Sequence, residues 1–174
     1  MNKSIEQWLA QTIVGLNLCP FAKDIVGTPQ FPHFYSPAQT EFEAQDKFLE
    51  VIQIMVEDAL PSALVVFEDW TIDFEIFHEF TQAMNEILED IELSDQMMAI
   101  SFHPDFQLAD APAESFAHWP NSSPLPLIHI LSHAEIEKVA SFILGKEISR
   151  VNEERIKNMS QAQRREHWPW KFNS

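Results

Sequence analysis

The chain has 174 residues, a mass of 20.1 kDa and a formal net charge of −16 at pH 7. Hydrophobic residues make up 45% of the sequence and charged residues 22%, which is typical of a folded globular protein and excludes a disordered one. The single cysteine excludes an internal disulfide framework and a cysteine-rich zinc site.

The composition also indicates which partners and locations to exclude. Duplex nucleic acid is bound through Lys and Arg, which neutralise its phosphates, so we expect no nucleic-acid partner for this acidic chain. No segment approaches the roughly 18 consecutive apolar residues of a membrane-spanning helix, so we expect no membrane association. Glu6, Gln7 and Gln11 interrupt the first apolar pattern, which argues against a signal peptide, and we therefore expect a cytoplasmic protein.

Apolar residues at helical or alternating spacing, with capping residues and prolines at the boundaries, divide the chain into helices and strands. In chain order we predict a helix over residues 4–20, an edge strand over 31–35, a helix over 40–61, a strand over 63–67, a helix over 71–91, strands over 97–103 and 127–131, and helices over 132–143 and 147–159. Residues 104–126 contain five prolines and no periodic pattern. A loop of this length inside a compact domain is usually functional or disordered.

This order of elements predicts an α/β or α+β layered sandwich. A small mixed sheet of about four strands would be covered by about five helices. The strands over 97–103 and 127–131 have no helix between them, so we expect them to be antiparallel neighbours with the long loop beside their ends. We predict one domain over residues 1–160, followed by a basic, Trp-containing tail over 161–174.

The sign of the charge changes along the chain. Residues 146–174 hold seven of the eleven basic residues and four acidic ones, a net charge of +3, whereas residues 1–145 hold four bases and 23 acids, a net charge of −19. This asymmetry predicts that the C-terminal segment clasps an acidic surface of its own chain or of a partner. A homodimer through the tail is one such arrangement, and packing within the chain is the simpler alternative.

Polar and ionisable side chains gather in and beside the long loop. His103, Asp105 and His129 are candidate ligands of a divalent transition metal, zinc or iron, or candidate acid–base catalysts because histidine titrates near neutral pH. The alternative is that both histidines are structural and hydrogen-bond to backbone carbonyls. The candidate binding residues beside them are Asp110, His118, Asn121 and Ser123.

Cys19 is the remaining candidate catalytic residue. The following residue, Pro20, is favoured at the first position of a helix, and a thiol at such a helix start would be biased towards the thiolate, which gives nucleophilic or redox character. The alternative is that Cys19, between Leu18 and Phe21, is a small buried apolar residue.

Three parts of the sequence resemble a bacterial family of unknown function, domain-of-unknown-function family 1415. The matching residues are 15–23 (GLNLCPFAK), 101–107 (SFHPDFQ), and then Asn121, Ser123, Pro124, Pro126 and His129. The resemblance covers roughly residues 5–155 and implies no activity. It implies one functional surface formed by Cys19, His103, Asp105, Asp110, Asn121 and His129.

The chain departs from the family pattern at two positions that bear on a ligand. Ser122 and Ser132 stand where the family has arginine, the residue best suited to hold a carboxylate or a phosphate. Nucleotide-binding, α/β-hydrolase and zincin motifs are also absent from the sequence.

Two hypotheses of function follow from these features. The first is a small enzyme or metal-binding domain with a site of histidine, aspartate and cysteine side chains. The second is a non-catalytic domain that binds a small molecule or a protein through its acidic body and its basic, aromatic tail. The sequence leaves open whether the protein is an enzyme.

Overall fold

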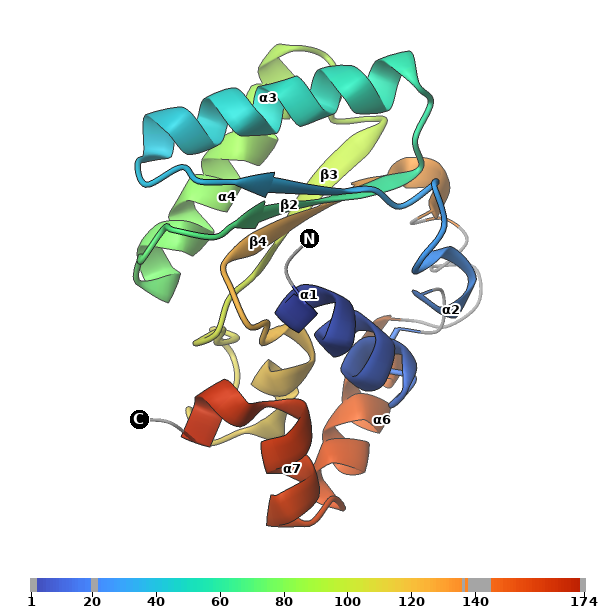
Figure 1. Cartoon of the computed structure of the whole chain (residues 1–174), viewed down its shortest axis with the longest axis vertical. Coiled ribbons are helices and arrows are strands. Elements are labelled where there is room, and N and C mark those ends of the chain that lie inside the picture. The colour runs from blue at the N-terminus through green and yellow to red at the C-terminus, as the bar shows by residue number, and fades with distance from the viewer. Residues whose placement is uncertain (1–2, 20–21, 136, 138–144, 173–174) are drawn as a thin grey trace.

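A computed structural model describes residues 3–19, 22–135, 137 and 145–172, and its centre is a four-stranded mixed sheet with the strand order β1-β2-β4-β3 (Figure 1). The strands are β1 (His33–Ser36), β2 (Ser62–Phe67), β3 (Met97–Phe102) and β4 (Leu127–Ser132). β1 and β2 are parallel, whereas β4 is antiparallel to both β2 and β3. The structure therefore confirms the α+β fold with a small mixed sheet, and the last two strands are antiparallel neighbours as expected.

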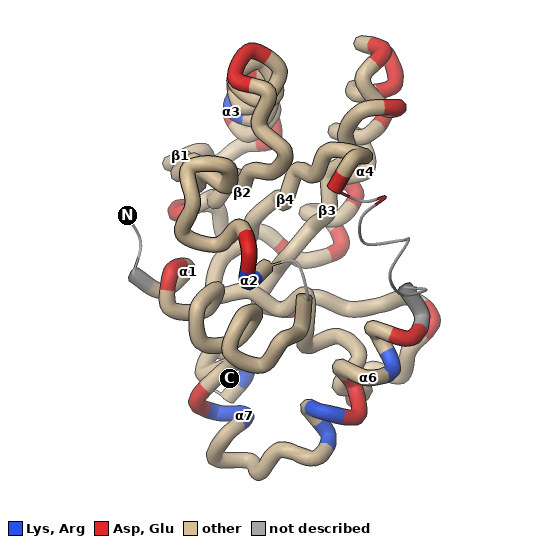
Figure 2. The backbone as a smooth tube through the Cα atoms, turned by 90° about the vertical axis from the view of Figure 1, so that its right-hand side faces the viewer, with Lys and Arg blue, Asp and Glu red and all other residues tan. Residues whose placement is uncertain are grey.

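Two long helices cover one face of the sheet, which we call the closed face (Figures 1 and 2). They are α3 (Glu41–Glu57) and α4 (Phe74–Asp90). The Thr40 hydroxyl caps α3 by accepting a hydrogen bond from the Glu43 N–H at 3.3 Å, as its capping pattern predicts. Asn85 joins α4 to β3 because its amide bonds both the N–H and the carbonyl of Ala99, at 2.8 and 3.0 Å.

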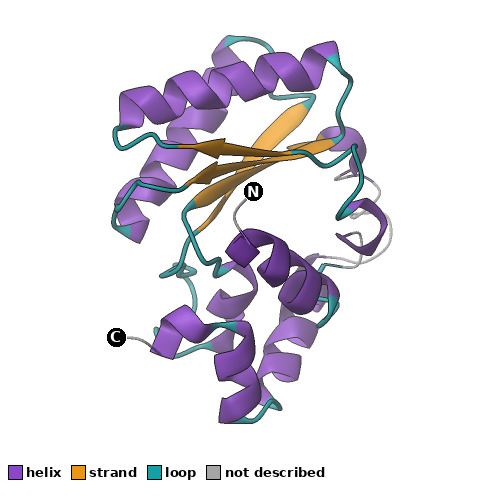
Figure 3. Cartoon of the chain, in the orientation of Figure 1, coloured by secondary structure: helices purple, strands orange, loops and turns teal. Residues whose placement is uncertain are grey.

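Shorter segments from both ends of the chain lie on the opposite side of the sheet, and we call that face the open face (Figure 3). These segments are α1 (Lys3–Trp8), the π-helix η1 (Leu9–Val14), α2 (Ala22–Ile25), α6 (Gly145–Lys157) and α7 (Gln161–His167). None of the helices in the described part of the chain has the length and apolar content that crossing a bilayer requires.

Some predicted boundaries differ from the structure. The first helix was expected to reach residue 20, but Asn17 has a positive φ of 50°, which ends helical geometry before that point. Residues 104–126 are not wholly irregular, because they contain the 3-10 helix η2 (Phe116–Asn121). The predicted helix over 132–143 depends on Ile136, Val139, Ala140 and Ile143, which lie outside the described residues.

The C-terminal segment packs against its own chain. Trp168 is fully buried and donates its indole N–H to the Trp119 carbonyl at 3.0 Å. In the 3-10 helix η3 (Pro169–Phe172), Lys171 donates to the Pro104 carbonyl at 3.0 Å. The Arg164 guanidinium lies over the Phe116 ring, 4.5 Å from its centroid. Arg164 and Lys171 therefore contact an aromatic ring and a backbone carbonyl of the same chain, and the charge of Asp105 also attracts Lys171.

Candidate functional site

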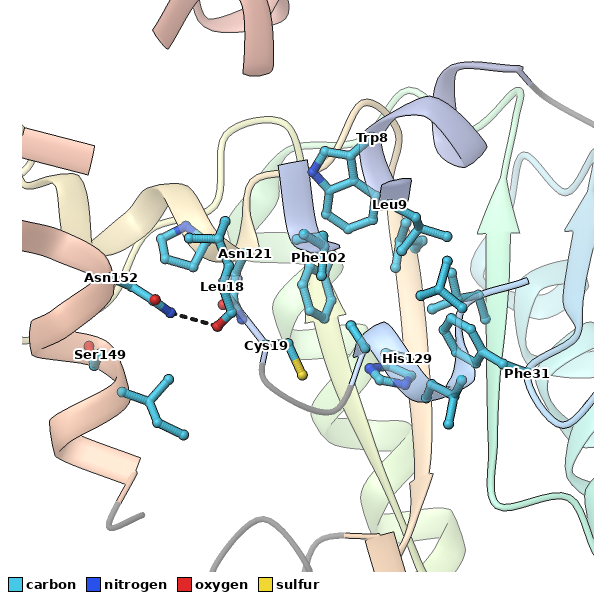
Figure 4. A pocket seen from close by; sticks show the side chains of 18 of the residues that line it. Trp8, Leu9, Leu18, Cys19, Phe31, Phe102, Asn121, His129, Ser149 and Asn152 are labelled. Atoms are coloured by element: carbon cyan, nitrogen blue, oxygen red, sulfur yellow. Dashed lines mark hydrogen bonds between the residues drawn. The ribbon is translucent and has the colours of Figure 1, made fainter. Parts of the chain in front are cut away.

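A cavity of about 290 Å³ lies on the open face of the sheet (Figure 4). Its wall is mostly apolar and is formed by side chains that include Trp8, Leu9, Ile13, Phe31, Phe102 and Leu127. The polar groups on the wall come from Cys19, Asn121, His129, Ser149 and Asn152. The cavity therefore joins strands β3 and β4 to segments near both ends of the chain.

The loop that carries Cys19 is shaped by residues of the 15–23 motif. A Cβ atom at Gly15 would collide with the Gln11 carbonyl oxygen, so the residue after η1 has no room for a side chain. Asn17 follows in the left-handed region, which asparagine tolerates better than most residues. Leu18 is buried in the core, and Cys19 lies beside the cavity, half-buried.

Helix α6 holds this loop in place through two polar side chains. The buried Asn152 donates its amide N–H to the Leu18 carbonyl at 2.7 Å (Figure 4), and Arg155 donates to the Asn17 carbonyl at 2.9 Å. Both bonds join positions more than 130 residues apart in the sequence. We did not predict Asn152 from the sequence. Its position is nevertheless a usable signal of a functional role, because this polar residue lies four positions from both Ile148 and Ile156, on the apolar side of the helix.

His129 presents its half-buried ring to the cavity from β4. Its Nε2 atom lies 2.7 Å from Ser62 Oγ, and the Phe31 ring meets it edge-on with centroids 5.4 Å apart. Burial, with a smaller contribution from the charge of His33, lowers the pKa of His129 to about 4. The imidazole is therefore neutral at neutral pH, which suits a hydrogen-bonding group better than an acid–base catalyst.

His103 lies on the other side of the sheet. Its Nε2–H donates to the Ile72 carbonyl at 3.0 Å, and its Nδ1 accepts the Asp105 backbone N–H at 3.1 Å. The ring packs against Phe74 and Phe77 on α4, with centroids 5.8 and 5.7 Å away, and burial lowers its pKa. Both ring nitrogens therefore form hydrogen bonds with backbone groups. This arrangement matches the alternative in which His103 has a structural role.

The register of β3 and β4 explains why the two histidines are separated. His129 pairs with Ile100, so its side chain shares a face with Ile100, whereas the strand alternation directs His103 to the opposite face with Ser101. The expected metal site of His103, Asp105 and His129 is therefore not assembled. Within the described residues, no cluster of three or more His, Cys, Asp or Glu side chains could hold a metal ion.

The other predicted residues also divide between the cavity and the loop. His118 is buried and clamps the loop, because its Nδ1 accepts the Leu108 N–H at 2.9 Å and its Nε2–H donates to the Pro112 carbonyl at 2.8 Å. The cavity wall includes Cys19, Asn121 and His129. The candidates that do not line it are His103, Asp105, Asp110, His118 and Ser123.

The fold and this cavity define an α+β protein with a hollow on one face of a mixed sheet. The chain belongs to the family described as "Protein of unknown function (DUF1415)", whose model matches residues 1–166, and the predicted family is thereby confirmed. Comparisons with curated proteins and with solved structures gave no match.

Proposed function

We propose that this protein binds a small, uncharged and largely apolar molecule in the open-face cavity. The observation that carries the proposal is a space of about 290 Å³ with a mostly apolar wall and a few polar groups. Small-molecule sites usually measure about 300–1,000 Å³ and combine these same features, so the cavity suits a compact ligand.

An apolar wall favours an uncharged ligand, because moving an ionised group from water into such surroundings costs several kcal/mol. The two positions at which the chain departs from the family pattern do not contribute to this preference, because neither of them lines the cavity. Ser122 is fully buried outside the cavity wall, and its hydroxyl donates to the Pro104 carbonyl at 2.8 Å. Ser132 likewise lies outside the set of residues that line the cavity. Hydrogen bonds to the ligand would come from the Asn121 amide, the neutral His129 imidazole and the Cys19 thiol.

The geometry supports binding over the metal-dependent and acid–base alternatives. His103 and His129 face opposite sides of the sheet, and the low pKa of His129 makes it a weak base. We further propose a cytoplasmic protein without a nucleic-acid partner. The acidic composition supports the absence of such a partner, and a reducing compartment would keep Cys19 as a thiol.

A fluorescence titration with 1-aminoanthracene, a small neutral aromatic probe, tests the proposal. We expect saturable binding by the native chain and binding weakened at least about tenfold by Ala22→Leu, which adds a larger side chain at a buried residue of the cavity wall. Ala162→Leu on an exposed position of α7 is the matched control and should bind like the native chain.

Thermal unfolding of Ala22→Leu distinguishes a filled cavity from a damaged fold. A leucine that enters empty space should leave the unfolding temperature unchanged or raise it. The proposal fails if the native chain binds no probe saturably, or if a folded Ala22→Leu variant binds as well as the native chain does.

Cys19 provides a second readout because it is the only cysteine in the sequence. Alkylation by N-ethylmaleimide, followed by mass spectrometry, should slow in proportion to the occupancy of the cavity by 1-aminoanthracene. Cys19→Ser should remain unlabelled and still bind the probe. A labelling rate that saturating probe leaves unchanged would place the bound molecule somewhere other than beside Cys19.

A further inference from the structure

A groove on the far side of the molecule from the cavity lies between α3 and α4. Its edges carry two exposed apolar side chains, Phe42 of α3 (73% exposed) and Ile76 of α4 (45% exposed). Phe80 and Met84, which are buried, also line it. The groove is therefore bordered by one solvent-exposed apolar side chain from each helix.

The two exposed side chains are not part of the stripes that join these helices to the sheet. The buried residues of α3 are Ala44, Phe48, Val51, Ile52 and Met55. The buried residues of α4 are Phe77, Phe80, Thr81, Met84 and Leu88. Phe42 and Ile76 lie outside both sets, so burial in the core does not account for either side chain.

The groove lies in the most acidic part of the chain. Residues 41–95 contain 16 acidic residues and a single base, Lys47, which pairs with Glu50 at 2.9 Å. Figure 2 shows acidic positions along α3 and α4 and basic positions on α6 and α7. Two acids, Glu41 and Glu79, line the groove itself. Such a concentration of one sign attracts a partner of the opposite sign.

We propose that this groove binds a basic, amphipathic segment of another protein. Apolar side chains of that segment would pack between Phe42 and Ile76, and its Lys or Arg side chains would face Glu41 and Glu79. A second copy of this chain fits less well, because each copy carries a net charge of −16. The aromatic residues beside its own bases, Trp168 and Trp170, already bond within the same chain.

Fluorescence anisotropy with a labelled helical peptide of leucine and lysine at amphipathic spacing tests this proposal. Phe42→Ala should weaken peptide binding about tenfold, because it removes the largest exposed side chain of the groove. Val56→Ala is the matched control, since Val56 is also an exposed residue of α3 (50%) but does not line the groove. This control should bind within about twofold of the native chain.

Two substitutions that each remove one negative charge complete the test. Glu79→Gln should weaken binding and flatten its dependence on salt more than Glu89→Gln, an exposed acid of α4 outside the groove. Equal effects of Phe42→Ala and Val56→Ala, or no saturable binding at all, would overturn the proposal. Self-association of the native chain that Phe42→Ala abolishes in sedimentation equilibrium would identify a second copy as the occupant, and would also overturn it.

Discussion

The two faces of the four-stranded sheet differ in packing. The contrast suggests that the closed face stabilises the fold and that the open face binds a ligand. On the closed face, Phe67, Trp70, Phe77 and Phe80 form a cluster of aromatic contacts with ring centroids 5.1–6.4 Å apart. On the open face, β4 presents His129 to a cavity of about 290 Å³. One face is filled with large apolar side chains, whereas the other keeps space and a few polar groups.

The difference arises from the segments on each side of the sheet. Two helices of 17 residues each, α3 and α4, can place a continuous apolar stripe against the sheet. The helices on the side of the open face are shorter and come from residues 3–25 and 145–167. Short helices joined by loops fill a sheet surface less completely, and the space that remains is where a ligand can bind. Substitutions can test this division of roles.

The largest effect is expected from Phe77→Ala on the closed face. The ring is fully buried in contact with Phe67 and Trp70, and its removal should lower the free energy of unfolding by about 3–5 kcal/mol. Urea unfolding followed by fluorescence measures this loss. The protein that remains folded should bind 1-aminoanthracene with unchanged affinity. A parallel loss of probe affinity would show that the two faces are not independent.

The pH dependence of stability should report on His129. Its pKa is about 4 in the folded chain and near the ordinary 6.5 when unfolded, so the unfolded state takes up a proton first as the pH falls. Above about pH 6.5 the free energy of unfolding is therefore not reduced by protonation of this ring. As the pH falls from about 6.5 towards 4, the free energy of unfolding should decrease by up to about 3 kcal/mol. The free energy of unfolding, measured with urea across this pH range, should change less steeply with pH for His129→Asn than for the native chain. Parallel curves would contradict the lowered pKa.

A matched pair of leucines compares the packing of the two faces directly. Leu88 is buried on the closed face, and Leu9 is buried beside the cavity. We expect Leu88→Ala to cost about 4 kcal/mol and Leu9→Ala about 2 kcal/mol, because a side chain that borders empty space loses fewer contacts on truncation. Chemical unfolding of both variants gives the two values. Equal costs would mean that the open face is packed as tightly as the closed one.

The smallest effect is expected from Ser62→Ala. Ser62 is fully buried, and its hydroxyl lies 2.7 Å from His129 Nε2. Loss of this hydrogen bond should lower the free energy of unfolding by about 1 kcal/mol. In His129→Asn the same serine substitution should cost less, and a double-mutant cycle by urea unfolding measures the difference. Additive effects would show that the contact contributes nothing to stability.

Much of the fold could be predicted because its signals are local. The continuous apolar run at 63–67 became β2, and the Thr40 cap marked the start of α3. The lack of a helix between β3 and β4 correctly predicted antiparallel neighbours. The insertion of β4 between β2 and β3 had no local signal, since a strand order depends on contacts between distant segments.

The site was predicted only in part, for the same physical reason. Cys19, Asn121 and His129 do line one cavity, and the sequence alone had already marked them through their residue types and motifs. The sequence also predicted the four strands, the long helices α3 and α4 and the charge split, because spacing and composition are properties of short stretches of chain. Only the tertiary structure decided that His103 faces away from His129, because a change of one residue in strand register moves a side chain to the other face. The cavity itself was likewise decided by segments more than a hundred residues apart, which meet only after folding.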